Sequence, residues 1–148
     1  MKGLLILLFV FTMGIVQAQE VLDRENVIMP VFPGCESMQS NESRQTCFSK
    51  KFTAEIEKKL NRKELNKFYN KMGMSKVHIM FQYTISDMGK IGELKLLNAK
   101  NGGNEHELFK YVRTAVSEIN HEFKIEPAKV GDNNGRVVLT ENFLYTVD

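Results

Sequence analysis

The two cysteines of the chain, Cys35 and Cys47, are the residues whose type and spacing most clearly indicate a chemistry. Eleven residues separate them, which is unlike a Cys-x-x-Cys redox motif, and two thiols are too few for a structural zinc site with four ligands. Nothing flanking either cysteine would strongly lower its pKa, so the alternative of a reactive thiol is disfavoured. In an oxidising compartment such a pair forms a disulfide, which at this loop length contributes about 3 kcal/mol.

The start of the chain indicates that compartment. Lys2 precedes an uncharged apolar run, and Val16-Gln17-Ala18 supplies the small residues of a signal-peptidase site. The run is several residues shorter than the roughly 20 apolar residues of a spanning helix. We therefore expect a signal peptide at 1–18, an extended leader at 19–29 and one exported domain at 30–148. A retained membrane anchor is the alternative.

The other residue types that can do chemistry do not assemble into a recognisable motif. The three histidines have no H-E-x-x-H spacing, and there is no G-x-S-x-G for a nucleophilic serine. The glycines near residue 102 lack both the lysine of a P-loop and the third glycine of a dinucleotide fingerprint. We expect no catalytic, cofactor or metal site, no small-molecule substrate and no enzymatic activity.

The charge balance excludes another class of function. Without its first 18 residues the chain carries 19 basic and 18 acidic residues, a net charge of +1. Proteins that bind nucleic acid through electrostatics present a strongly basic face. We therefore do not expect a nucleic-acid partner.

Hydrophobic periodicity predicts the elements that surround the cysteines. Ser40 or Asn41 can cap a helix whose apolar residues recur every four positions from 48 to 60, and the pattern continues helically over 61–72. A further helix begins near Asn104. Residues 27–32 can form a short edge strand, and residues 131–135 are expected to form a loose polar turn.

Alternation of apolar and polar residues predicts three longer strands. These strands cover 77–85, 91–99 and 136–147, and the first two are joined by a hairpin turn in which Gly89 takes a positive φ. The expected fold is α+β with two layers, in the order helix-strand-strand-helix-strand. Its three-stranded antiparallel sheet has the first strand in the centre and two helices packed on one face.

The last strand is then left at an edge of the sheet. An exposed edge is a docking site for an extended peptide, but proteins also blunt such edges with charges. Glu141 lies within the apolar alternation of this strand and can be such a charge. The residues alone leave docking and blunting as equal alternatives.

Four segments resemble the C-terminal domain of TonB proteins, in the variant with Pro-Gly-Cys and a second cysteine before the first helix. They are VFPGCE at 31–36, CF at 47–48, ISDMGKIGELKLLNAKN at 85–101 and EPAKVGDNNGRVV at 126–138. The resemblance covers most of the chain after Pro30. The chain has only 3 prolines, so it lacks the long proline-rich spacer of a full energy transducer. It also lacks a clear tyrosine-proline pair near its end.

The resemblance implies a periplasmic binding domain for TonB-dependent transmembrane transport. The TonB-box segment of an outer-membrane receptor would add as a strand to the last strand of the sheet. Carried over by position, the partner-binding residues are Val137, Val138, Leu139, Thr140, Glu141, Asn142, Phe143, Leu144 and Tyr145. The alternatives are a minimal energy transducer anchored in the inner membrane by its N-terminal segment, and a structural homodimer that pairs through the same strand.

Overall fold

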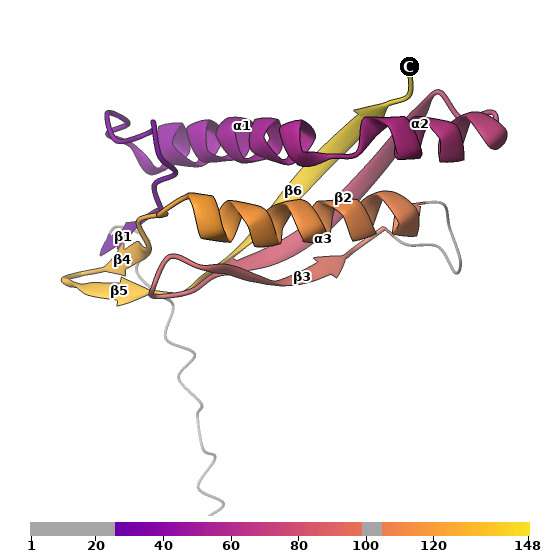
Figure 1. The fold of residues 1–148 in the computed structure, drawn as a ribbon. Coiled ribbons are helices and arrows are strands. Elements are labelled where there is room, and N and C mark those ends of the chain that lie inside the picture. Colours follow the sequence, from indigo (N-terminus) through magenta and orange to yellow (C-terminus); the bar gives the residue numbers. More distant parts are fainter. Residues whose placement is uncertain (1–25, 99–104) are drawn as a thin grey trace, which may run out of the picture.

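The computed structural model describes residues 26–98 and 105–148, and its larger sheet has the last strand of the chain at one edge (Figure 1). This sheet contains β2 (Lys76–Ile85), β3 (Ile91–Leu96) and β6 (Val137–Thr146), in the order β3-β2-β6. Both pairings are antiparallel. The predicted strand order, with the first of these strands in the centre, is therefore confirmed.

The turn between β2 and β3 shows why the hairpin has a glycine. Gly89 adopts a φ of 74°, as predicted. A Cβ at this position would lie 1.9 Å from the carbonyl oxygen of Ile125, so the backbone there has no room for a side chain. Glycine at this position therefore allows the hairpin to lie close to the segment that follows the last helix.

Three helices lie on one face of the larger sheet: α1 (Asn41–Lys59), α2 (Arg62–Lys71) and α3 (Glu105–Glu122) (Figure 1). Ser40 caps α1 in a capping box with Ser43. The apolar stripe of α1 is buried as predicted, and α3 buries a second stripe. These residues are Phe48, Phe52 and Ile56 of α1, and Leu108, Phe109, Val112, Ala115, Val116 and Ile119 of α3.

The prediction of two helices is wrong, because the first helical pattern contains a break. Leu60 has an extended backbone with ψ 136°, so α1 ends before it. The side chain of Asn61 then accepts a hydrogen bond from the Glu64 N–H and caps α2. Apolar residues lie on the buried side both before and after the break, so the periodicity alone does not show it.

A second, smaller antiparallel sheet lies at one end of the molecule. It contains β1 (Val27–Ile28), β4 (Ala128–Val130) and β5 (Asn133–Gly135), in the order β1-β4-β5. The prediction of a loose turn over 131–135 is wrong, since β4 and β5 form a hairpin around Gly131. The predicted strand at 27–32 is confirmed for β1, and Val31 forms a separate bridge to Glu126.

The predicted disulfide joins Cys35 to Cys47, with 5.9 Å between their Cα atoms. It fastens the loop after Phe32 to the second turn of α1. Phe32 is fully buried and contacts the ring of Phe48 edge-on at a centroid distance of 5.3 Å. The bridge and this aromatic contact together fix the position of the first half of α1.

The signal peptide predicted at 1–18, most of the leader, and the helix start predicted at Asn104 lie outside the described residues. Within the described ranges, the structure contains no helix that is long and apolar enough to cross a membrane.

Candidate binding edge

The candidate site is the outer edge of β6. This strand pairs with β2 over ten consecutive residues without a register shift. Just beyond the strand, the Val147 N–H donates to the carbonyl of Ser75 on the β2 side at 2.9 Å. Because the main-chain groups of successive residues alternate between the two sides of a strand, the even-numbered residues of β6 direct theirs away from β2.

Among these outward groups, the Asn142 N–H bonds to the side chain of Glu141 and the carbonyl of Thr146 also has a partner. The Arg62 guanidinium donates to the carbonyl of Thr146 at 3.1 Å, which agrees with the outward direction of that residue. The four outward-facing residues before it are Val138, Thr140, Asn142 and Leu144. In the described part of the chain, no strand pairs with their main-chain groups on this side.

The side chains of β6 alternate between two environments. The odd-numbered residues from Leu139 to Tyr145 are buried against the helices, whereas the even-numbered residues are exposed. Val138 and Leu144 remain 53% and 51% exposed. Large apolar side chains therefore lie on the open face of the sheet, beside the outward main-chain groups of β6.

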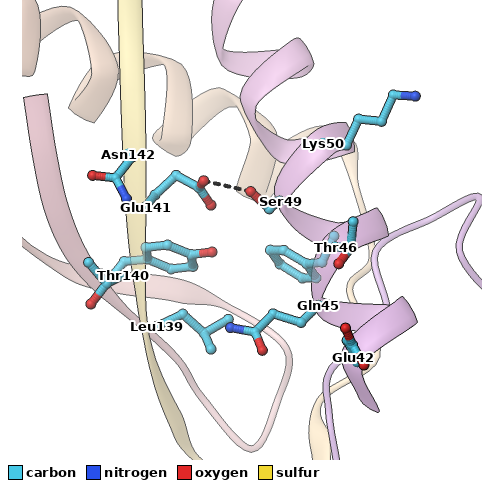
Figure 2. Close-up of a pocket in the computed structure, with 11 residues that line it drawn as sticks. Glu42, Gln45, Thr46, Ser49, Lys50, Leu139, Thr140, Glu141 and Asn142 are labelled. Atoms are coloured by element: carbon cyan, nitrogen blue, oxygen red, sulfur yellow. Dashed lines mark hydrogen bonds between the residues drawn. The ribbon is translucent and has the colours of Figure 1, made fainter. Parts of the chain in front are cut away.

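A groove of about 530 Å³ runs between β6 and the first half of α1 (Figure 2). The buried rings of Phe48 and Tyr83 line it together with Leu139. Its polar lining comes from both elements, namely Glu42, Gln45, Thr46, Ser49 and Lys50 of α1 and Thr140, Glu141 and Asn142 of β6. The groove thus has one wall made of helix and one made of strand edge.

Glu141 projects from β6 toward α1, where the Ser49 hydroxyl donates to its Oε1 at 2.6 Å (Figure 2). Only 7% of this residue is exposed. Burial raises the pKa of Glu141 above its ordinary value, while the bonds from Ser49 and from the Asn142 N–H lower it in part. Burial also raises the pKa of Tyr83, and the nearby charge of Glu141 adds to that effect.

No cation of this chain neutralises Glu141 within the described ranges, where no basic group lies within 4.0 Å of its carboxylate. Lys50 lines the groove, but its side chain extends away from it (Figure 2). Glu42 adds a second carboxylate to the lining. Among the described residues, the buried carboxylate in the groove therefore has one hydroxyl partner, one main-chain N–H partner and no counter-ion.

The far end of β6 is closed by α2. The Tyr145 hydroxyl donates to Asn66 Oδ1 at 2.6 Å, and the Arg62 guanidinium lies 5.1 Å from the centre of the Tyr145 ring. Arg62 also forms an ion pair with Asp148 at 2.6 Å. The accessible part of the edge therefore extends from Val138 to Leu144.

All nine residues predicted from the resemblance lie on β6, but they contribute differently. Val137 pairs with Ile85 at the start of the strand, and Tyr145 is buried under α2. The α1 wall was not predicted, and Ser49 is its most important member. The sequence signal for Ser49 is that a small polar residue directly follows Phe48, which belongs to the apolar stripe of the helix.

The described residues contain no group of three or more histidine, cysteine, aspartate or glutamate side chains that could hold a metal ion. In comparisons with known proteins, no family model matches the chain. No curated protein matches it at a significant level either.

Proposed function

We propose that this chain is a non-enzymatic binding module that takes up an extended peptide by strand addition along β6. The observation that carries the proposal is the set of outward main-chain groups of Val138, Thr140, Asn142 and Leu144, which have no strand beside them in the described part of the chain. A guest strand would hydrogen-bond to these groups, and its side chains would enter the groove beside α1.

The resemblance to TonB C-terminal domains supports a particular source for the guest. By that analogy the domain is periplasmic, and the guest is the TonB-box segment of an outer-membrane transporter. The same edge can also pair with its own copy, because Val138 and Leu144 expose apolar surface beside it. Sedimentation of the chain at several concentrations without peptide distinguishes this homodimer from the peptide-binding module.

The direct test is a titration of the exported chain with peptides from the N-termini of outer-membrane transporters, monitored by amide NMR. We expect the largest shifts at Val138, Thr140 and Leu144, whose N–H groups would gain partners, and a smaller shift at Asn142, whose N–H already bonds to the Glu141 carboxylate. We expect small shifts at the inward-facing Phe143. If none of these peptides perturbs β6, the proposal is wrong.

A proline at Thr140 tests whether the main chain is the binding element. Thr140→Pro removes an outward donor but leaves the pairing to β2 in place, since prolines are accepted on the open side of edge strands. We expect peptide affinity to fall about tenfold or more, because a hydrogen bond is lost and the ring obstructs the guest.

Thr140→Ala is the matched control for this variant. It removes the same exposed side chain and retains the N–H, so its affinity should stay close to that of the unchanged chain. Equal losses for the two variants would assign the effect to the threonine side chain and would count against strand addition.

A further inference from the structure

We propose that Glu141 selects the guest, and that the segment taken up along β6 carries a lysine or arginine at the position opposite this residue. The inference rests on the proposed strand addition and adds the chemistry of the occupant. Its basis is the buried carboxylate in the groove and the direction in which the guest's side chains must point.

The direction follows from the register of β6. The main-chain groups of Glu141 face β2, so in antiparallel addition the residue opposite it belongs to a pair without direct hydrogen bonds. In such pairs the Cα atoms are only about 4.5 Å apart, and the two side chains point to the same face. The guest residue opposite Glu141 therefore points into the groove, between the carboxylate and α1.

The carboxylate has capacity for this partner. The Ser49 hydroxyl donates to Oε1 at 2.6 Å and the Asn142 N–H is a second donor, whereas an ionised carboxylate accepts at about four lone-pair positions. A lysine or arginine of the guest would supply a charge-assisted bond within a partly dehydrated groove. An acidic guest residue would meet both Glu141 and Glu42 and be repelled.

The lack of a counter-ion for Glu141 among the described residues favours recognition over a structural role. Burying a carboxylate without a cation is unfavourable for the fold. Among the described residues, Glu141 is the only charged residue that is buried. A structural carboxylate on this strand would be expected to have an arginine or lysine beside it, whereas a carboxylate that binds a guest must leave that place open.

A selection experiment tests the inference even though the guest sequence is unidentified. A random nine-residue peptide library on phage is selected against the full exported chain and, in parallel, against Glu141→Gln. The amide variant keeps an acceptor for Ser49 and nearly the same volume, so the fold is retained, which an overlay of amide NMR spectra checks. The matched control is Glu126→Gln, which removes an exposed carboxylate that does not line the groove.

We expect the peptides enriched on the unchanged chain to share lysine or arginine at one fixed position, and this preference to vanish on Glu141→Gln. Synthetic copies should bind Glu141→Gln about tenfold more weakly and bind Glu126→Gln within about twofold of the unchanged chain. Replacing the basic residue of the peptide by glutamine should cost little affinity on Glu141→Gln, because the two changes remove the same interaction.

The outcomes separate this inference from the proposed function. Peptides that perturb β6 without a basic preference would overturn the inference and leave strand addition standing, and Glu141 would then be an inward charge that blunts the edge. If no peptide is enriched, or if the chain instead self-associates through β6, both proposals are wrong.

Discussion

The two edges of the larger sheet are built in opposite ways. β3 has six residues, and its pairing with β2 shifts register between Gln82 and Thr84, opposite Glu93, which has a φ of 50°. On its outer side, Asn120 of α3 accepts from the Ile91 N–H and donates to the Ile91 carbonyl, at 2.9 and 2.7 Å. β6 has ten residues in uninterrupted register.

The glutamates on the two edge strands also differ in exposure and in their partners. Glu93 on β3 is exposed and accepts bonds from Arg136 and from the Thr84 hydroxyl. Glu141 on β6 is buried and has only Ser49 as a side-chain partner among the described residues. Short length, a bulge and a covering side chain are the devices by which proteins blunt an edge. In the described part of the chain, these devices are present at β3 and β6 is left open, which is the expected arrangement if one edge is used for binding.

Removing the disulfide should have the largest effect on the difference between the two edges. The bridge fixes α1, and this helix borders only the β6 edge. Replacing Cys35 and Cys47 by alanine should lower the free energy of unfolding by about 3 kcal/mol, measured by urea denaturation. Peptide affinity at β6 should fall as well, because the first turns of α1 form one wall of the groove.

Reduction of the unchanged chain with dithiothreitol serves as the control, and it should reproduce the loss of stability. The hydrogen exchange of Ile91 should change little under conditions where the chain stays folded, since Asn120 still covers the β3 edge. An unchanged urea midpoint would contradict the stabilising role of the bridge.

Removing the side chain that covers the β3 edge should have the next largest effect on the difference between the two edges. Asn120→Ala removes both bonds to Ile91 and should cost about 2 kcal/mol. The Ile91 amide should then exchange faster with deuterated solvent, because its N–H loses its partner.

Asn98→Ala is the matched control for this loss. It also removes two side-chain bonds to the main chain, to Met80 and His78 of β2, but it leaves the outer edge of β3 covered. Asn120→Ala should therefore speed the hydrogen exchange of the Ile91 amide more than Asn98→Ala does. If both variants change its exchange equally, Asn120 is not a specific cover of that edge.

The sequence predicts the β6 edge of the sheet better than the β3 edge. Alternation along 77–85 and 136–147 is strong because each strand buries one face, so the two strands are predicted from it. The strand order and the edge position of β6 then follow from the rule that sequential strands pair and from the helical crossover to the last strand. The cover on β3 joins Asn120 to Ile91, 29 residues away, and no local pattern encodes that contact. The β4–β5 hairpin was missed for a similar reason, because Asn133 and Asn134 have low strand propensity and pair only through tertiary context.

The candidate site was predictable on its strand side alone. The polar residue Glu141 at an inward position of β6 was visible as an exception in the alternation. Its environment was not, because Ser49 lies 92 residues away and the distance between α1 and β6 depends on packing. A violation of the apolar pattern therefore located the position, and only the fold showed that the carboxylate has a hydroxyl partner and, among the described residues, no cation.

The smallest expected effect concerns the stability of the β6 side at different pH values. Burial raises the folded-state pKa of Glu141 above the ordinary value of 4.5. The folded chain therefore holds this proton more tightly than the unfolded chain, so Glu141 contributes stability at low pH. This contribution is lost as the pH rises through the folded-state pKa, because folding then buries an ionised group.

Glu141→Gln cannot ionise and should avoid this loss. Relative to the unchanged chain, its melting temperature should rise with pH from about pH 4 upward and then reach a plateau. Glu126→Gln should show no such trend, since Glu126 is exposed. A difference between Glu141→Gln and the unchanged chain that stays constant or falls with pH would show that the carboxylate does not destabilise the fold. A difference that rises, together with weaker binding of basic peptides, would show that the chain gives up stability at this edge for the sake of recognition.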